Sequence, residues 1–141
     1  MTHPDAPGDI RGLERIWPEP GFLSLDELRE DYARTWPDAS EGSGAMMISS
    51  LDGSAVLGAV SGGLSSPADQ KLMDVQRSVV DAVVIGAGTL REEGYGGLQV
   101  HDDSAAWRRA RGMSEHPVLV VVSRSLDLDP ASDFLAEAPV R

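Results

Sequence analysis

The sequence of 141 residues contains no cysteine, few aromatic residues and no hydrophobic run long enough to span a membrane. Without cysteine, both disulfide bonds and thiolate metal sites are excluded. Basic residues are also scarce, with 12 Lys and Arg against 23 Asp and Glu and a net charge of −11. No basic stripe can neutralise phosphates, so a nucleic-acid partner is not expected. His3, His101 and His116 lack the close spacing of a metal site, and no metal is expected.

The composition that remains is that of a globular protein. Hydrophobic residues make up 41% and charged residues 25% of the chain, a balance typical of folded rather than disordered sequences. The length suits one domain. The first ten residues lack the charged and apolar regions of a signal peptide, so the prediction is a cytoplasmic protein.

The N-terminal part of the chain, residues 1–43, is expected to be an arm with one short helix. Residues 1–21 are rich in Pro, Gly and Asp, which favours an extended or poorly ordered segment. Ser24 and Glu27 have the spacing of a capping box, and they predict a helix from about Leu25 to Ala33.

The next segment predicts two strands and a long helix. Residues 45–49 (AMMIS) have the pattern of a first core strand, and residues 54–60 that of a second, weaker strand after a turn at Asp52-Gly53. Ser66 followed by Pro67 is a typical helix start. Apolar residues then recur at three- and four-residue steps as far as Val80, so one helix is predicted there.

The segment that follows is the most informative in the chain. Residues 82–85 form a short valine-rich run, as expected of a strand covered on both faces. The run stops at Gly86-Ala87-Gly88-Thr89, where the glycines let the backbone turn and approach a ligand, and Thr89 occupies a predicted N-cap. Ligands of open α/β sheets bind at the carboxyl ends of strands. An ordinary strand-to-helix turn is the alternative.

The remaining elements complete an alternating pattern. Residues 103–112 predict a short surface helix with an aspartate cap, whose arginines complement the helix dipole or, alternatively, capture an anion. Residues 117–123 (PVLVVVS) predict the strongest strand, and residues 132–136 a helical turn. Alternating strands and helices indicate an α/β protein with a mostly parallel sheet flanked by helices.

Two familiar nucleotide-binding motifs are missing. The P-loop pattern is absent, and the dinucleotide fingerprint fails because Arg91 stands where its third glycine is required. The motifs that are present follow another order: S-S-L-D-G, then S-G-x-x-S-x-P, an arginine ten residues past that proline, and D-A-V-V-I-G-A-G-T. This order closely resembles the reductase domain of riboflavin biosynthesis, in the pyrimidine reductase group with the dihydrofolate reductase-like fold. R-R-A-R-G-x-S-E-x-P resembles actinobacterial stand-alone members.

The resemblance implies an enzyme that passes hydride from NADPH to a ribosylamino-pyrimidine phosphate, opening the ribose into a ribityl chain. Ser61 and Arg77 match the substrate-contacting serine and arginine, and a guanidinium suits a phosphate. The cofactor-binding positions implied by the resemblance are Gly86, Gly88, Thr89 and Glu93. Glu93 stands at a family aspartate near nicotinamide and substrate, so it is also the candidate catalytic residue; a solvated loop acid is its alternative.

Departures from the family pattern leave other readings open. Gly63 replaces a frequent tryptophan, and an arginine is missing near Leu98-Gln99. A pterin or dihydrofolate-like heterocycle is therefore an alternative substrate. The family also continues with further βα units, so residues 44–141 are expected to be the N-terminal half of a reductase domain. The chain would then be an incomplete half-domain that needs another chain; a homodimer is also possible.

Overall fold

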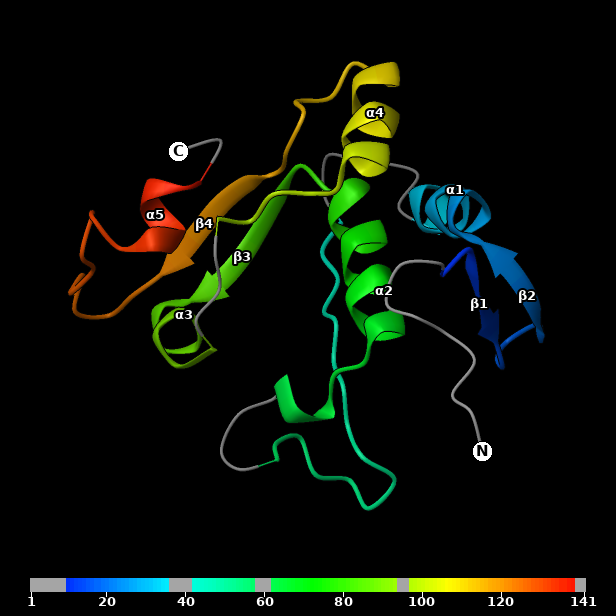
Figure 1. Ribbon diagram of the computed structural model, residues 1–141, viewed down its shortest axis with the longest axis horizontal. Coiled ribbons are helices and arrows are strands. Elements are labelled where there is room, and N and C mark those ends of the chain that lie inside the picture. Colours follow the sequence, from blue (N-terminus) through cyan, green and yellow to red (C-terminus); the bar gives the residue numbers. More distant parts are fainter. Residues whose placement is uncertain (1–9, 36–41, 58–61, 94–96, 139–141) are drawn as a thin grey trace.

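The structure, a computed structural model, describes residues 10–35, 42–57, 62–93 and 97–138. Within these residues the chain forms an N-terminal hairpin and helix, followed by helices packed on a parallel pair of strands (Figure 1). The sheets are separate: β1 pairs with β2, and β3 pairs with β4.

The N-terminal segment is more ordered than its composition predicts. Strands β1 (Gly12–Arg15) and β2 (Gly21–Ser24) form an antiparallel hairpin in which Leu13 lies opposite Leu23. The expectation of an extended arm is therefore wrong for these residues. Glycine is required at position 12, because a Cβ there would collide with the carbonyl oxygen of Leu23. Pro18 and Pro20 lie between the two strands, and Gly12 and Gly21 are the first residues of the strands.

Helix α1 (Leu25–Thr35) begins at the predicted capping box. The amide of Glu27 donates to Ser24 Oγ at 3.3 Å, while the amide and hydroxyl of Ser24 donate to Glu27 Oε2 at 2.8 and 2.7 Å. The hydroxyl bond, and then the amide bond, hold the pKa of Glu27 below its ordinary value. The helix continues two residues past the predicted end at Ala33.

Residues 42–57 contain the predicted turn but not the predicted strands. Gly53 has a φ of +85°, and its amide donates to the carbonyl of Ser50 at 2.9 Å. Residues 45–49 form no strand, and Met47 is 85% exposed. Of the second predicted strand, residues 54–56 are not in a strand, Leu57 makes an isolated bridge, and residues 58–60 lie outside the described part. A strand needs a neighbour for its backbone groups, and within the described residues no strand pairs with residues 45–49.

A short 3-10 turn, η1 (Gly62–Leu64), leads into helix α2 (Pro67–Ser78). Its predicted start is confirmed: Ser66 is the N-cap, and its hydroxyl accepts from the amide of Asp69 at 3.2 Å. The predicted apolar face is anchored by Val75, which is fully buried. The helix ends at Ser78 rather than Val80, with Val79 as its C-cap.

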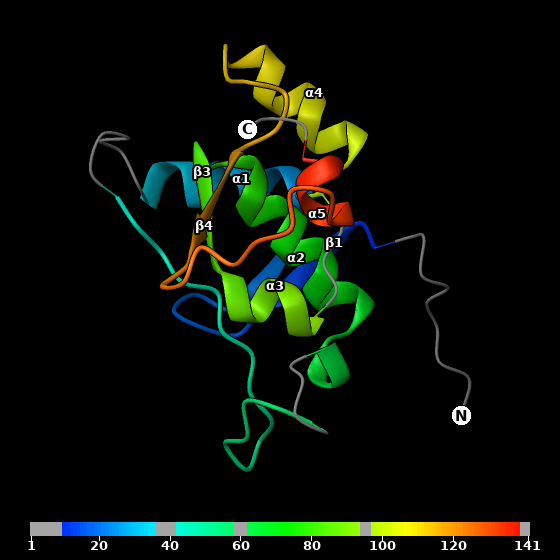
Figure 2. The same cartoon turned by 90° about the vertical axis from the view of Figure 1, so that its left-hand side faces the viewer.

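Strands β3 (Ala82–Gly86) and β4 (Val118–Val122) are parallel and pair in register from Ala82 opposite Val118 to Gly86 opposite Val122. Helices α2, α3 (Ala87–Glu93) and α5 (Asp133–Ala136) lie to one side of this pair (Figure 2). The other face is open, with Val84 65% and Val122 61% exposed. The prediction that residues 82–85 are covered on both faces is therefore wrong.

Helix α4 (Asp102–Ala110) begins one residue before the predicted aspartate cap, and His101 is its N-cap. It packs against α2, which in turn contacts α1. The core runs between these helices and the covered face of the sheet. Its buried apolar residues are Leu28, Val75, Ala87, Leu90, Leu98, Val100, Ala105, Phe134 and Ala138.

Candidate functional site at the carboxyl end of β3

The glycine turn lies at the carboxyl end of β3, where the strand passes directly into α3. Ala87 and Leu90 are 4% and 2% exposed and anchor this helix in the core. Gly86, Gly88 and Thr89 alternate with these anchors and are exposed. The local sequence thus fixes the backbone through its apolar residues and leaves the small and hydroxyl-bearing residues on the surface.

The surface at this turn is open to a ligand. A Cβ at Gly88 would meet no atom within 4 Å, and one at Gly86 would meet only Thr89 Oγ1 at 3.7 Å. A ligand group can therefore approach the backbone at both glycines, beside the Thr89 hydroxyl. Thr89 is not the N-cap that its position predicted, because α3 begins two residues earlier at Ala87. The turn therefore presents backbone groups and one hydroxyl to solvent as possible hydrogen-bonding partners.

Two predicted site residues have no described side chain. Ser61 lies outside the described residues, and Glu93 is described only as the last residue of α3. Glu93 follows Thr89 by four residues along the chain.

Arg77 lies near the start of β3, at the opposite end of that strand from the glycine turn. It is half-buried in the last turn of α2, and a short connection leads from there to the first residue of β3. The glycine turn lies at the other end of that five-residue strand, about 15 Å away at the usual rise per residue. The structure therefore does not bring Arg77 to Thr89.

Arg108 holds the end of α2 in place, a role that the sequence did not reveal. It is fully buried, although residues 103–112 predicted a surface helix. Its Nη1 donates to the carbonyls of Val80, Ser78 and Arg77 at 2.6, 3.1 and 3.3 Å. Its Nε donates to the carbonyl of Ser114 at 2.7 Å. These bonds occupy the guanidinium, so Arg108 does not capture an external anion.

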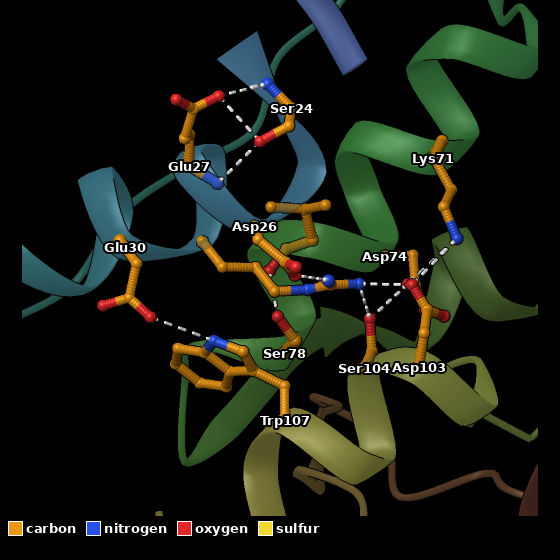
Figure 3. Close-up of polar contacts among 12 residues, drawn as sticks. Ser24, Asp26, Glu27, Glu30, Lys71, Asp74, Ser78, Asp103, Ser104 and Trp107 are labelled. Carbon is orange, nitrogen blue, oxygen red and sulfur yellow. Dashed lines mark hydrogen bonds and ion pairs between the residues drawn. The ribbon is translucent and has the colours of Figure 1, made fainter. Parts of the chain in front are cut away.

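A buried polar cluster joins α1, α2 and α4 (Figure 3). Arg29, which is 2% exposed, donates through Nη2 to Asp103 Oδ2 at 2.6 Å and to Ser104 Oγ at 2.8 Å. Ser104 donates in turn to Asp74 Oδ2 at 2.5 Å. Burial opposes ionisation of Asp103, but the bond from Arg29 and the charge of Lys71 outweigh it, so the pKa of Asp103 lies below its ordinary value. This cluster fastens the N-terminal unit to the rest of the chain.

The turn in the S-S-L-D-G motif borders a shallow hollow. Its walls are mostly apolar, and Asp52 accepts the hydroxyl of Ser50 on its rim. That bond, followed by the amide of Ser54, lowers the pKa of Asp52. Asp52 therefore stabilises the turn. The lining residues are Ser50, Leu51, Asp52, Ser54, Val56, Leu57 and Leu64.

Residues 45–140 match the family model of the RibD C-terminal domain. The chain belongs to this family. β1, β2 and α1 precede the matched residues. The resemblance to riboflavin-biosynthesis reductases is thus confirmed, and so is the predicted α/β class with the dihydrofolate reductase-like fold.

A solved structure agrees with this assignment. The chain is 33% identical to a pyrimidine reductase-like protein from Corynebacterium diphtheriae, with a TM-score of 0.59. The match covers 67% of this chain but 40% of the C. diphtheriae protein, so this RibD-family chain spans well under half the length of that relative. No curated protein matches the chain.

Other kinds of site are not found in the described part of the chain. No group of three His, Cys, Asp or Glu residues in it could hold a metal ion. No helix among the described residues is long and apolar enough to cross a membrane.

Proposed function

We propose that this RibD-family chain forms part of an NADPH-dependent reductase of the riboflavin type. The reaction is hydride transfer that converts the ribosyl group of a ribosylamino-pyrimidine phosphate into a ribityl chain. The observation that carries the proposal is the exposed surface of Gly86, Gly88 and Thr89 at the carboxyl end of β3. It lies in a sequence that matches the family over residues 45–140.

In this proposal the cofactor and the substrate use separate parts of the chain. Backbone groups at Gly86 and Gly88 and the hydroxyl of Thr89 hold oxygens of NADPH. Bound there, NADPH supplies the hydride, so the protein needs no nucleophile. Arg77, which lies beyond the other end of β3, binds the substrate phosphate through its guanidinium. Ser61 adds a donor to the substrate, and Glu93 holds the proton that the reduced sugar requires.

The first experiment is calorimetric titration of the 141-residue chain with NADPH. Micromolar binding, about 8 kcal/mol, is expected. Thr89→Val should weaken it roughly three- to tenfold, the usual effect of one lost hydrogen bond. Thr35→Val is the matched control, because Thr35 is the last residue of α1 and its hydroxyl donates to the carbonyl of Asp31 in its own helix.

Arg77→Ala tests the division between the two ligands. It should leave the affinity for NADPH unchanged and weaken binding of a phosphorylated ribosylamino-pyrimidine. Absence of NADPH binding by the folded chain would overturn the proposal for the chain on its own. Equal losses of cofactor affinity in Thr89→Val and Thr35→Val would remove Thr89 from the site.

A second candidate substrate is an unphosphorylated heterocycle such as a pterin. Leu98 is 3% exposed, and Gln99 Nε2 donates to the carbonyl of Glu137 at 3.3 Å, so neither residue offers a cation to a phosphate. Reduction of pterins and ribosylamino-pyrimidines, followed by oxidation of NADPH in parallel assays, separates the two. Faster oxidation with the pterin would favour this alternative.

A further inference from the structure

The last turn of α2 carries Arg77 and is held by contacts from two other helices. One contact comes from α4, where Arg108 Nη1 donates to the carbonyl of Arg77 at 3.3 Å. The other comes from α1, where the hydroxyl of Tyr32 accepts a hydrogen bond from Gln76 Nε2 at 3.0 Å. Gln76 directly precedes Arg77 in the sequence. The backbone that carries Arg77 is therefore fixed by residues of α1 and α4.

The contact with Tyr32 acts where a helix is least stable. The last turn of a helix is prone to open, because its carbonyl groups have no partners within the helix. In α2 this turn is closed by the amide of Val79, which donates to the carbonyl of Gln76 at 3.3 Å. The side chain of Gln76 is bonded to Tyr32 at the same time. Gln76 is thus held through both its backbone and its side chain, and an arginine on a fixed backbone has less freedom to lose when it binds a ligand.

Tyr32 itself belongs to a helix that is firmly attached. Arg29 lies one turn before it on α1, and residues at that spacing are neighbours on a helix surface. The buried guanidinium of Arg29 donates to Asp103 and Ser104 of α4. Ser104 donates in turn to Asp74 of α2 (Figure 3). The hydroxyl of Tyr32 is therefore presented to α2 from a helix whose own place is set by buried polar contacts.

This contact connects two parts of the chain with different standing in the family. Tyr32 precedes residues 45–140, which match the family model, whereas Gln76 and Arg77 lie within them. The motif that contains Arg77 therefore does not include the tyrosine that bonds to its neighbour.

We propose that Tyr32 is a positioning residue for Arg77. Through Gln76 it holds the last turn of α2, so that the guanidinium of Arg77 is placed to bind a phosphate group. The unit formed by β1, β2 and α1 thereby takes part in substrate binding without touching the substrate. This inference rests on the proposed function, because binding of phosphate by Arg77 is taken from it.

The test is an NMR titration of the 141-residue chain with ribose 5-phosphate, which carries the sugar phosphate of the proposed substrate. Tyr32→Phe should weaken binding about three- to fivefold, within the range expected for one lost hydrogen bond. Arg77→Ala should weaken it at least about tenfold, because the charged partner itself is removed. The titration needs no NADPH, so a failure of the cofactor site leaves this result readable.

A double-mutant cycle shows whether Tyr32 acts through Gln76. Gln76→Met has a similar length but cannot donate to the tyrosine. The double variant Tyr32→Phe, Gln76→Met should bind ribose 5-phosphate no more weakly than either single variant, because both remove the same bond. Thr35→Val is the control, since it removes a hydroxyl from the same helix that bonds to Asp31 within that helix. It should bind like the unmodified chain, and circular dichroism confirms that every variant is folded.

The outcomes separate this inference from the proposed function. Unchanged binding in Tyr32→Phe, together with a loss in Arg77→Ala, would overturn the role of Tyr32 and leave the proposed function in place. Losses that add up in the double variant would also overturn it, because Tyr32 and Gln76 would then act separately, and so would an equal loss in Thr35→Val. Equal binding by Arg77→Ala and the unmodified chain, or no binding by either, would remove Arg77 from the substrate site and overturn both.

Discussion

Replacing Arg108 by methionine tests whether one buried guanidinium holds the end of α2. The substitution keeps most of the side-chain volume but removes every donor. The carbonyls of Arg77, Ser78 and Val80 then lose a shared partner at the C-terminus of α2, and Ser114 loses two bonds. Desolvation lowers the pKa of Arg108, but an arginine remains protonated, so the native contacts are all charge-assisted.

The magnitude follows from the geometry of these bonds. The two shortest, at 2.6 and 2.7 Å to Val80 and Ser114, each contribute roughly 1.5–3 kcal/mol as hydrogen bonds to a charged group. The longer bonds add less, and relief of the buried charge offsets part of the loss. We therefore expect the free energy of unfolding to fall by about 3–4 kcal/mol. With a urea m value of about 2 kcal/mol/M, the midpoint should fall by about 1.5–2 M.

The assay is urea denaturation followed by far-UV circular dichroism, combined with hydrogen exchange of the last turn of α2. Arg109→Met is the matched control, because that neighbouring side chain is 53% exposed and pairs only with Glu115 on the surface. Its loss should change stability by about 0.5 kcal/mol or less. Equal midpoints for the two variants, or unchanged exchange at the end of α2, would refute the role assigned to Arg108.

Three further predictions concern other parts of the fold. The lowered pKa of Asp103 means that its ionised form adds stability above the ordinary aspartate pKa of about 4 and loses it as the pH falls further. Asp103→Asn should thus flatten the loss of stability below about pH 4, measured by urea denaturation across pH; an unchanged acid slope would contradict this. Ser66→Ala removes the N-cap of α2 and should lower the free energy of unfolding by about 1 kcal/mol in the same assay; an unchanged urea midpoint would contradict this. Leu90→Ala should lower the free energy of unfolding by about 2–5 kcal/mol, because this side chain is only 2% exposed. The control Leu126→Ala should change the unfolding temperature little, because Leu126 is 78% exposed. Similar shifts in unfolding temperature for the two variants would show that α3 is not anchored in the core.

Local sequence determined the caps of α1 and α2 and the turn at Gly53, whereas the caps predicted at Thr89 and Asp103 are not formed. The capping box at Ser24 and the N-cap at Ser66 form within one helical turn, so the residues that make them are neighbours in the sequence. Gly53 takes a positive φ that few other residues adopt, which fixes the turn in S-S-L-D-G. The valine runs of β3 and β4, with helices between them, predicted a parallel pair, and the structure has it.

The sequence predicted the part of the candidate site whose residues are neighbours along the chain. The glycine turn lies at the carboxyl end of β3 because it comes directly after that strand in the sequence. Its residues Gly86, Gly88 and Thr89 are exposed because the neighbouring Leu90 takes the buried position. The place of Arg77 at the other end of β3 is a property of the packing of α2. The roles of Ser61 and Glu93 remain predictions.

Only the tertiary structure decided the fate of residues whose partners are distant in the sequence. Arg108 is buried because the carbonyl end of α2, about thirty residues earlier, needs donors, and the RRAR sequence of α4 does not distinguish Arg108 from its exposed neighbour Arg109. Residues 45–49 have strand character but form no strand, because pairing depends on a neighbour and not on propensity. The β1–β2 hairpin forms because each strand has the other as its neighbour. Val84 is exposed because no described element packs on that face of the sheet. The residues that form a helix cap lie within a few positions of one another in the sequence. The neighbours of a strand and the partners of a buried charge come from distant parts of the sequence, so only the tertiary structure shows them.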